Sequence, residues 1–241
     1  MNANSPGDAD IQRQYYTETA NQYDDLHVAE NDEHYLALDF MLSMLDHYDI
    51  KSVLDIGAGT GRTVAYVKKH RPDIRIVGLE PVEALRQIGY QQGLTESDLI
   101  SGDALNLDIV AGEFDLVCAY GVLHHIKQPE RAVAEMLRVA GKSIFISDAN
   151  NFGQGSLFVR LFKQISNSLG LWKLVDLIKT RGKGYTISEE DGLAYSYSVF
   201  NNYGQIEQQC RLVHLFNTIG GRINFYRSAS HVALMGIKKE I

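Results

Sequence analysis

The clearest candidate for a ligand site in this 241-residue sequence is the run Gly57-Ala58-Gly59-Thr60-Gly61. It follows an apolar segment, Ser52–Ile56, that reads as a buried strand, and it precedes the helical pattern Arg62–His70. Glycines let the backbone turn sharply and approach a ligand closely, and the free N–H groups of a helix start point at that ligand. The pattern predicts a site for a nucleotide-type ligand.

The acid two residues before this loop narrows the choice of ligand. A carboxylate at Asp55 would repel the pyrophosphate of a dinucleotide but favour the ammonium and sulfonium groups of S-adenosylmethionine. The spacing also departs from the dinucleotide pattern G-x-G-x-x-G, because Arg62 stands where the third glycine would be. Of two enzyme classes with such a loop, these residues favour an enzyme that uses S-adenosylmethionine over a nicotinamide-dependent dehydrogenase.

Two further acids follow two further predicted strands. Glu80 comes after Ile74–Leu79, where a carboxylate could accept hydrogen bonds from both ribose hydroxyls. Asp103 comes after Asp98–Ile100 and could accept from an adenine amino group. Each alone could be a solvated strand end or a helix cap, but the carboxyl ends of parallel strands meet at one edge of a sheet. We therefore expect Asp55, Glu80 and Asp103 to share one site.

Candidates for proton transfer follow two later apolar runs. His124 and His125 come just after Phe114–Tyr120, and Asp148 ends Ser143–Ser147. An imidazole there could take a proton near neutral pH, although packing or loop anchoring is an alternative for each residue. No His, Asp or Glu group has metal-ligand spacing, so we expect no catalytic metal.

The segment Asn150–Asn202 interrupts the alternation of strands and helices, and we expect it to be helical, without a clear strand. Its residues 151–184 carry six Lys or Arg against one Asp, a charge of +5, while the whole chain has −7. Such a basic amphipathic segment could be a lid packed on the core or an interfacial element, with membrane contact through residues 156–181. The residues that we expect to line a substrate pocket are Tyr185, Tyr195, Tyr197, Tyr203 and Arg181.

Short apolar runs that alternate with helical stretches predict a doubly wound α/β fold. Residues 1–50 would form a helical N-terminal cover, 51–149 a Rossmann-like core, 150–202 the helical insertion, and 203–241 a helix and the last two strands. No apolar run reaches membrane-spanning length, and two widely separated cysteines suit a reducing cytoplasm. The net charge argues against nucleic acid as the main partner.

The stretch Val53–Arg62, VLDIGAGTGR, with the acid after the second strand and Asp103-Ala104 after the third, resembles the class I S-adenosylmethionine-dependent methyltransferases. The resemblance runs to about Asp148. It implies a mostly parallel seven-stranded sheet whose last strand is antiparallel, with Tyr120 beside the transferable methyl group. Tyr16 and Tyr23 resemble the family's helix that covers the cofactor, although packing on the core is an alternative. The cofactor-binding residues implied are Asp55, Gly57, Ala58, Gly59, Gly61, Glu80, Pro81, Asp103, Ala104, Tyr120, Tyr16 and Tyr23.

Methyl transfer from a sulfonium is an in-line displacement, so the protein mainly aligns the nucleophile and excludes water. The function that we expect is methylation of a small or medium-sized acceptor, at an oxygen of a metabolite, a sugar or a lipid-linked intermediate. Methylation at nitrogen or carbon and a non-catalytic module that binds S-adenosylmethionine remain alternatives. The acceptor and the oligomeric state are not determined by the sequence.

Overall fold

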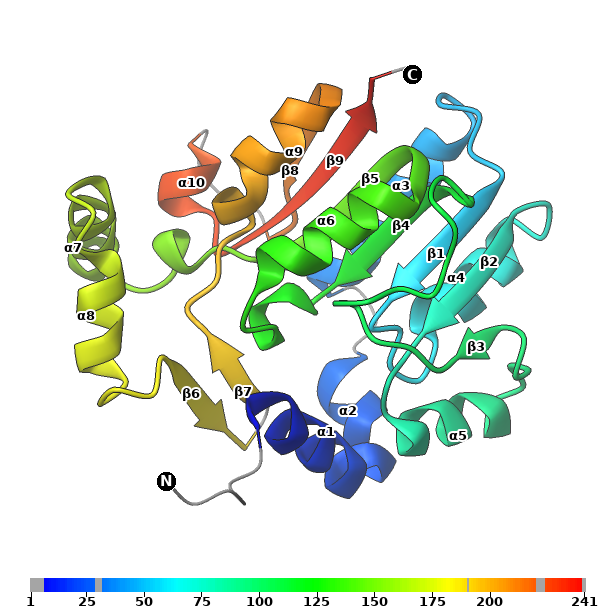
Figure 1. Cartoon of the computed structure of the whole chain (residues 1–241), viewed down its shortest axis with the longest axis horizontal. Helices are drawn as coiled ribbons and strands as arrows, with labels where there is room; N and C mark the ends of the chain where they lie inside the picture. The colour runs from blue at the N-terminus through cyan, green and yellow to red at the C-terminus, as the bar shows by residue number, and fades with distance from the viewer. Residues whose placement is uncertain (1–6, 29–31, 190, 220–223, 240–241) are drawn as a thin grey trace.

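A computed structural model describes residues 7–28, 32–189, 191–219 and 224–239. Seven strands form one sheet in the order β3-β2-β1-β4-β5-β9-β8, in which β9 runs antiparallel to both of its neighbours (Figure 1). The strands are β1 (Ser52–Ile56), β2 (Arg75–Leu79), β3 (Leu99–Ile100), β4 (Phe114–Tyr120), β5 (Ala140–Ala149), β8 (Cys210–Asn217) and β9 (His231–Lys238). The expected doubly wound, mostly parallel seven-stranded sheet is confirmed.

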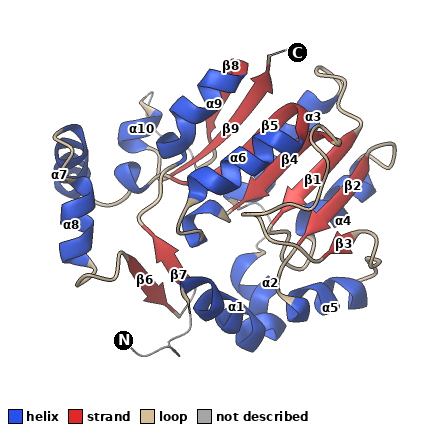
Figure 2. Cartoon of the chain, viewed as in Figure 1, coloured by secondary structure: helices blue, strands red, loops and turns tan. Residues whose placement is uncertain are grey.

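Helices cover both faces of the sheet (Figure 2). One face packs against α6 (Pro129–Val139) and α9 (Tyr203–Gln209), and the other against α3 (Glu33–Leu45) and α4 (Arg62–His70). Successive strand residues point to opposite faces, so Leu54 lies in the first core and Val53 in the second. This two-sided burial is why the strands read as continuous apolar runs.

The N-terminal helices lie at the carboxyl ends of the parallel strands (Figure 1). Within the N-terminal cover that we expect to be helical, the structure has α1 (Asp8–Thr19), a 3₁₀ turn at Ala20–Gln22, and α2 (Tyr23–His27). Tyr16 and Tyr23 pack with residues of α5 (Glu83–Gln91) in a small third apolar cluster. The N-terminal segment therefore covers the edge of the sheet at which Glu80 and Asp103 follow β2 and β3.

The α-helices of the insertion lie in its first half. The insertion begins with a 3₁₀ turn at Asn151–Gly153 and continues through α7 (Leu157–Ser168) and α8 (Trp172–Lys179). The expectation that it contains no strand is wrong, because β6 (Tyr185–Ser188) and β7 (Gly192–Tyr195) form an antiparallel hairpin. Each of these strands has only four residues, and such a short segment shows no clear alternation of apolar and polar residues that could have predicted the hairpin.

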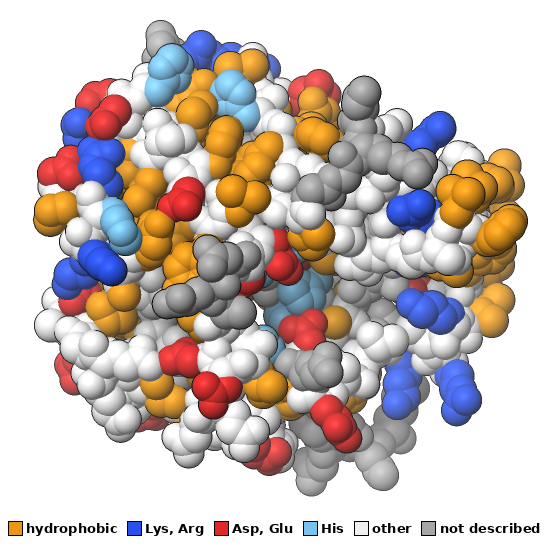
Figure 3. All heavy atoms as spheres, turned by 180° about the vertical axis from the view of Figure 1, so that it is seen from behind, with side chains coloured by type: hydrophobic (Ala, Val, Ile, Leu, Met, Phe, Trp, Pro, Cys, Tyr) orange, Lys and Arg blue, Asp and Glu red, His pale blue; other side chains and the backbone are white. Residues whose placement is uncertain are grey.

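The interpretation of α7 and α8 as helices packed on the core is also wrong for most of their apolar side chains. Phe158 is 83% exposed and Ile178 is 71% exposed. Figure 3 shows hydrophobic side chains gathered at the right edge of the molecule, where α7 and α8 lie in that view. Among the residues described, no helix is long and apolar enough to cross a membrane.

The remaining short elements fix where the insertion leaves and re-enters the core. They are η2 (Leu123–His125), η4 (Val199–Asn202) and α10 (Phe225–Ser228). Asn150 donates side-chain hydrogen bonds to the carbonyl oxygens of Phe225, Tyr226 and Ala229 and accepts one from the Ser198 hydroxyl. One buried amide thus joins both ends of the insertion to α10.

We expect Gly153→Ala to destabilise the fold, because a Cβ at this position would lie 1.8 Å from the carbonyl oxygen of Ala229. Overpacking of this kind costs about 1–3 kcal/mol or more. Gly204→Ala in α9 is the matched control, since no atom lies within 4 Å of its added Cβ. Urea unfolding should give a lower free energy for the first variant only; equal values would show that the Gly153 turn tolerates displacement.

Candidate functional site

The glycine loop after β1 is held in place by the end of β2. Gly57, Gly59 and Gly61 adopt φ values of 69°, 59° and 94°, which are accessible to glycine at little cost. The amides of Gly57 and Ala58 both donate to the carbonyl oxygen of Leu79, at 2.8 and 3.1 Å. These two hydrogen bonds hold the loop against the carboxyl end of β2.

Glu80 is the second link between this loop and β2. Its carboxylate accepts from the amide of Gly59 at 3.0 Å and from the amide of Val82 at 2.9 Å. Burial raises the pKa of Glu80 to about 7, although the two amides favour the charged form. A buried carboxylate with remaining acceptor capacity is well suited to bind hydroxyl groups of a ligand.

Two cavities open beside the end of β4. The first has a volume of about 560 Å³ and the second a volume of about 510 Å³. This first cavity lies among α1, β2, β3 and the end of β4. The expected cofactor residues that line it are Gly57, Glu80, Pro81, Asp103, Ala104, Tyr120, Tyr16 and Tyr23. Its volume is in the range of small-molecule and cofactor sites, so these residues fit a nucleoside with an attached chain.

The other expected cofactor residues do not line the first cavity. Ala58 and Asp55 line a small adjoining pocket of about 20 Å³. Gly59 lies against the Tyr23 hydroxyl, and Gly61 against Leu94, so an added Cβ would clash at 2.5 and 2.2 Å respectively. The glycines of the loop thus serve close packing as well as any ligand.

Asp55 is almost fully buried behind the loop. Burial raises its pKa to about 7, against hydrogen bonds from Thr63 and Cys118 that favour the charged form. Gly57, Tyr23 and Tyr120 line both the small pocket and the first cavity. These three residues therefore separate Asp55 from a ligand in the first cavity.

Asp103 lies at the opposite end of the first cavity and is half exposed. It accepts a hydrogen bond from the amide of Leu105 at 2.9 Å and forms an ion pair with Arg13 of α1 at 2.9 Å. The N-terminal helix is thereby fastened to the end of β3. An exposed ion pair of this kind contributes at most about 1 kcal/mol, so α1 can be displaced here.

The second cavity has a volume of about 510 Å³ and meets the first at Gly121 and Tyr195, which line both. Its walls are rich in imidazole and carboxylate groups. Those that line it are His27, Asp32, Glu33, His34, His124, Asp191 and His231. A compartment with this lining suits a polar acceptor molecule.

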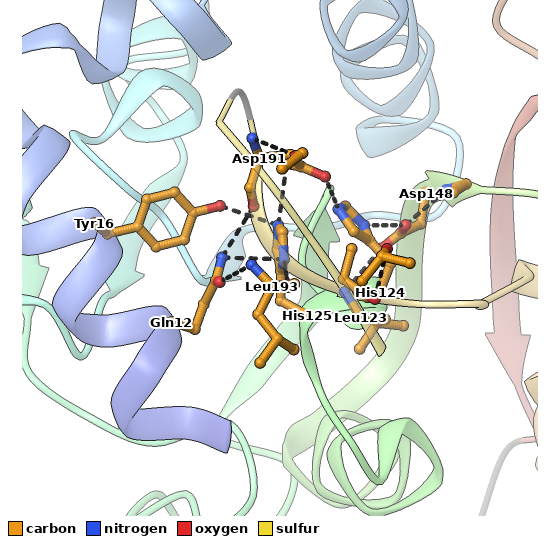
Figure 4. A network of polar contacts seen from close by, with 12 residues as sticks. Gln12, Tyr16, Leu123, His124, His125, Asp148, Asp191 and Leu193 are labelled. Carbon is orange, nitrogen blue, oxygen red and sulfur yellow. Dashed lines mark hydrogen bonds and ion pairs between the residues drawn. The ribbon is translucent and has the colours of Figure 1, made fainter. Parts of the chain in front are cut away.

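His124 lies between two carboxylates in the wall of the second cavity (Figure 4). Its Nδ1 donates to Asp148 at 2.7 Å, and its Nε2 donates to Asp191 at 3.3 Å. Burial opposes the charged imidazole, but the two carboxylates outweigh burial and raise the pKa of His124 to about 10. His124 therefore carries a positive charge at neutral pH.

Asp148 is the fully buried partner of this charge. Burial raises its pKa, but His124 outweighs burial and lowers that pKa to about 2. The carboxylate also accepts from the amides of Leu123 and Ala149, at 2.8 and 2.6 Å. Asp148 thus fixes the η2 turn after β4 against the end of β5.

His125 joins the β6–β7 hairpin to α1 (Figure 4). Its Nδ1 contacts the carbonyl oxygen of Leu193 at 2.7 Å, and its Nε2 contacts the Tyr16 hydroxyl at 3.0 Å. Burial and the neighbouring charge of His124 lower the pKa of His125. In the neutral tautomer that this arrangement favours, Nδ1 donates to Leu193 and Nε2 accepts from Tyr16, so both ring nitrogens are occupied.

Sequence reasoning missed His34 and His231, which face each other with ring centroids 4.8 Å apart. Each Nδ1 lies near a hydroxyl, that of Ser147 at 3.3 Å for His34 and that of Thr218 at 2.8 Å for His231. Burial lowers the pKa of both rings, so both are neutral at pH 7. The only sequence signal was the helix start after Asp32, which places His34 in the first turn of α3.

Two side-chain groups among the described residues could hold a metal ion. One is Glu33, His34 and His231, and the other is His124, His125 and Asp191; within each group the ligand atoms lie within 4.8 Å of one another. In the second group the ring nitrogens already contact carboxylates, a carbonyl and a hydroxyl. Only the first leaves ring nitrogens that face the second cavity. The expectation of no catalytic metal stays a prediction.

The expected substrate residues are only partly brought together. Tyr195 and Tyr197 line the second cavity, with their hydroxyls donating to Asp8 and Asn202 at 2.9 Å each. Tyr203 packs on the core cluster beneath α6 and α9 instead. Tyr185 contacts the Tyr195 ring, and Arg181 is exposed in the turn after α8; neither lines a cavity.

Comparisons with known proteins agree with this geometry. Residues 54–143 match a family model described as a methyltransferase domain. Residues 54–143 form a class I S-adenosylmethionine-dependent methyltransferase domain. Its cofactor is S-adenosylmethionine. The first cavity is called the cofactor cavity and the second the acceptor cavity, after the roles that we propose for them.

Two curated relatives match the same part of the chain. Norajmaline N-methyltransferase of Rauvolfia serpentina is 39% identical over 37% of this chain and 32% of its own length. Ribosomal RNA small subunit methyltransferase C of Pasteurella multocida is 33% identical over 42% of this chain and 32% of its own length. The matched segment thus spans about a third of these relatives.

A solved structure extends the likeness of fold to nearly the whole chain. Magnesium protoporphyrin IX methyltransferase of Synechocystis, with bound SAH, superimposes with a TM-score of 0.62 at 14% identity, over 97% of this chain and 100% of its own. At that identity the likeness concerns the fold alone. The names of the three proteins give acceptors of different kinds.

We expect Glu80→Ala to weaken binding of S-adenosylhomocysteine by at least tenfold, because hydrogen bonds to a charged group contribute about 1.5–3 kcal/mol each. The variant should also unfold at lower temperature, since Glu80 holds the amides of Gly59 and Val82. Glu83→Ala, at an exposed carboxylate in the first turn of α5, is the control. Calorimetry decides: an unchanged dissociation constant would limit Glu80 to holding the loop.

Proposed function

We propose that the protein transfers the methyl group of S-adenosylmethionine to an oxygen of a small or medium-sized acceptor that binds in the acceptor cavity. The observation that carries the proposal is the junction of the two cavities at Gly121 and Tyr195. Gly121 directly follows β4, at the carboxyl edge of the sheet where ligands of such folds bind. When bound, the cofactor supplies an electrophilic methyl group on a sulfonium.

The residues of this chain would hold and shield the two reactants. Glu80 would bind the ribose hydroxyls, Asp103 with Ala104 the adenine, and Gly57 with Tyr16 and Tyr23 the rest of the cofactor. The acceptor cavity would align the nucleophile, which can contribute about 7–11 kcal/mol to the lowering of the barrier. The hairpin and α1, which His125 joins, would exclude water from the junction when both reactants are bound.

We propose His34 as the group that takes the proton from the acceptor hydroxyl. A Cβ at Gly121 would lie 3.1 Å from His34 Nε2, so this nitrogen faces the residue that both cavities share. In the tautomer whose Nδ1 donates to the Ser147 hydroxyl, Nε2 would carry the lone pair that accepts the proton. His124 is charged and Asp148 is bound by His124, so we assign to both a positioning role in place of the expected proton transfer.

An oxygen acceptor is favoured over a nitrogen acceptor by this base. A hydroxyl must lose its proton during transfer, whereas an amine can react through its free lone pair. The acceptor cavity wall carries the carboxylates of Asp32, Glu33 and Asp191 beside the cations of His124 and Lys179, which suits an acceptor with several polar groups. A non-catalytic module would need no compartment of about 510 Å³ beside the cofactor cavity. Free, buried Cys118 and Cys210 accord with the reducing cytoplasm that we propose as its location.

The test is transfer of label from methyl-labelled S-adenosylmethionine to polar metabolites and lipid extracts of the producing cells, with RNA as a separate arm. We expect a labelled methyl ether or ester in one of the first two arms, and none with Glu80→Ala at low cofactor concentration. Label in RNA alone would contradict the proposal of a small acceptor. Binding of the cofactor without transfer to any fraction would favour the non-catalytic module.

We expect His34→Asn to lower kcat by about 10²–10⁴-fold, the range of general-base catalysis. Because burial lowers the pKa of His34 well below 6.5, the wild-type rate should stay constant from pH 8 to pH 6.5 and fall only in more acidic solution, as His34 gains a proton. His47→Asn, an exposed ring in the turn after α3, is the control.

The pH profile of His34→Asn should lack this acidic fall. Dialysis against EDTA should leave the wild-type rate unchanged. Loss of the rate on chelation, with recovery on adding Zn²⁺ or Mn²⁺, would show instead that His34 is a metal ligand together with Glu33 and His231.

A further inference from the structure

The apolar stripes of α7 and α8 face solvent, which is the reverse of the arrangement in most helices of globular proteins. Eleven of the seventeen large apolar side chains that are exposed among the described residues lie between residues 157 and 178. On α7 the spacing of Phe158, Phe162, Ile165 and Leu169 puts them on one side of the helix. An apolar surface of this size marks a binding surface.

Exposed cations accompany this apolar surface. Lys173, Lys179, Arg181 and Lys183 are exposed, and none forms an ion pair with another described residue. Figure 3 shows Lys and Arg side chains just below the hydrophobic group at that edge. A surface with an apolar centre and a basic rim is complementary to the acyl chains and charged headgroups of an anionic membrane.

The same charges argue against a second copy of the chain as the occupant. In a twofold dimer the surface would meet its own copy, so the four cations of one protomer would approach those of the other. Residues 151–184 carry +5 while the whole chain carries −7, so the positive charge is concentrated on this segment. A negatively charged lipid surface meets both the apolar and the electrostatic requirement.

We infer that α7 and α8 dock the protein on an anionic lipid bilayer, with the helices lying in the interface. α7 has 12 residues and α8 has 8, so neither can cross the hydrocarbon core of about 30 Å. α7, α8 and the turn to Gly184 together form what we call the docking surface.

Docking would place the acceptor cavity beside the bilayer. Lys179 at the end of α8 and Gln154 just before α7 both line that cavity. A membrane-bound amphiphile could therefore present a polar headgroup to the cavity while its chains stay in the lipid. This step rests on the proposed function and assigns its acceptor to the class of lipid-linked hydroxyl compounds.

The docking is tested by sedimentation of the full chain with vesicles, without acceptor or cofactor. Vesicles of phosphatidylcholine alone are compared with vesicles that also contain phosphatidylglycerol, whose negative surface potential attracts Lys and Arg side chains. We expect binding to the anionic vesicles, weakened as salt is raised, and much weaker binding to the neutral vesicles.

Two pairs of variants separate the apolar and the charged contributions. Phe158→Ser with Ile178→Ser should lower the affinity for anionic vesicles at least tenfold, whereas Val110→Ser with Leu212→Ser, at exposed apolar residues elsewhere, should not. Lys173→Gln with Lys183→Gln should lower it roughly 5-fold per cation, or about 25-fold together. Lys69→Gln with Arg211→Gln, which changes the net charge equally at exposed positions, is the control.

Three results would overturn the inference: no vesicle binding, equal binding to neutral and anionic vesicles, or equal effects of the docking and control variants. The wild-type protein could instead form dimers and bind no vesicles. If the Phe158→Ser with Ile178→Ser variant were then monomeric, the docking surface would be an interface between copies of the chain. Affinity for S-adenosylhomocysteine, measured on every variant, should be unchanged. The methyl-transfer proposal is judged by the label experiment alone, so it can survive a failure of docking.

Discussion

The buried ion pairs of His124 hold together the parts from which both cavities are built. Asp148 at the end of β5 and Asp191 in the hairpin accept from its two ring nitrogens. Removing one partner of a buried pair costs about 3–5 kcal/mol, because it leaves a charge without compensation. Together with the contacts of His125 and Gln12 to Leu193, this imidazolium holds the hairpin against the end of the sheet.

The same pair limits the pH range over which it stabilises the fold. Asp148 has a lowered pKa, so its contribution is present above the ordinary value of 3.8 and is lost as the pH falls through about 2. His124 has a raised pKa, so its contribution is present below 6.5 and is lost as the pH rises through about 10. The hairpin is therefore fastened at neutral pH, where the buried His34 nearby is uncharged. One histidine can carry structure while another is free for chemistry.

The insertion combines two tasks in one segment. In its hairpin half, β7 packs against α1, where the Gln12 side chain accepts from the amide of Leu193. Its helical half is apolar and basic and points outward. The combination is what favours an acceptor at a lipid surface.

The sequence by itself determined the sheet, the loop and the three acids, because those features are local. A strand, a glycine turn and a strand-end carboxylate are each fixed by residues next to one another in the chain, and parallel strands bring such ends to one edge. The helix Arg62–His70 has the bounds that the sequence pattern predicts. Glu80 and Asp103 accordingly line one cavity.

The assignment of the histidines was decided only by the tertiary structure. His34 and His231 are far apart in the sequence, and neither lies in a recognisable motif, yet they meet across the acceptor cavity. From the sequence, His124 is a candidate base. In the structure it contacts two carboxylates, 24 and 67 residues away in the chain, which keep its imidazole positively charged. The direction of the apolar stripes on α7 was undetermined for the same reason. Charge state and burial depend on which distant residues become neighbours, and local pattern carries no information about that.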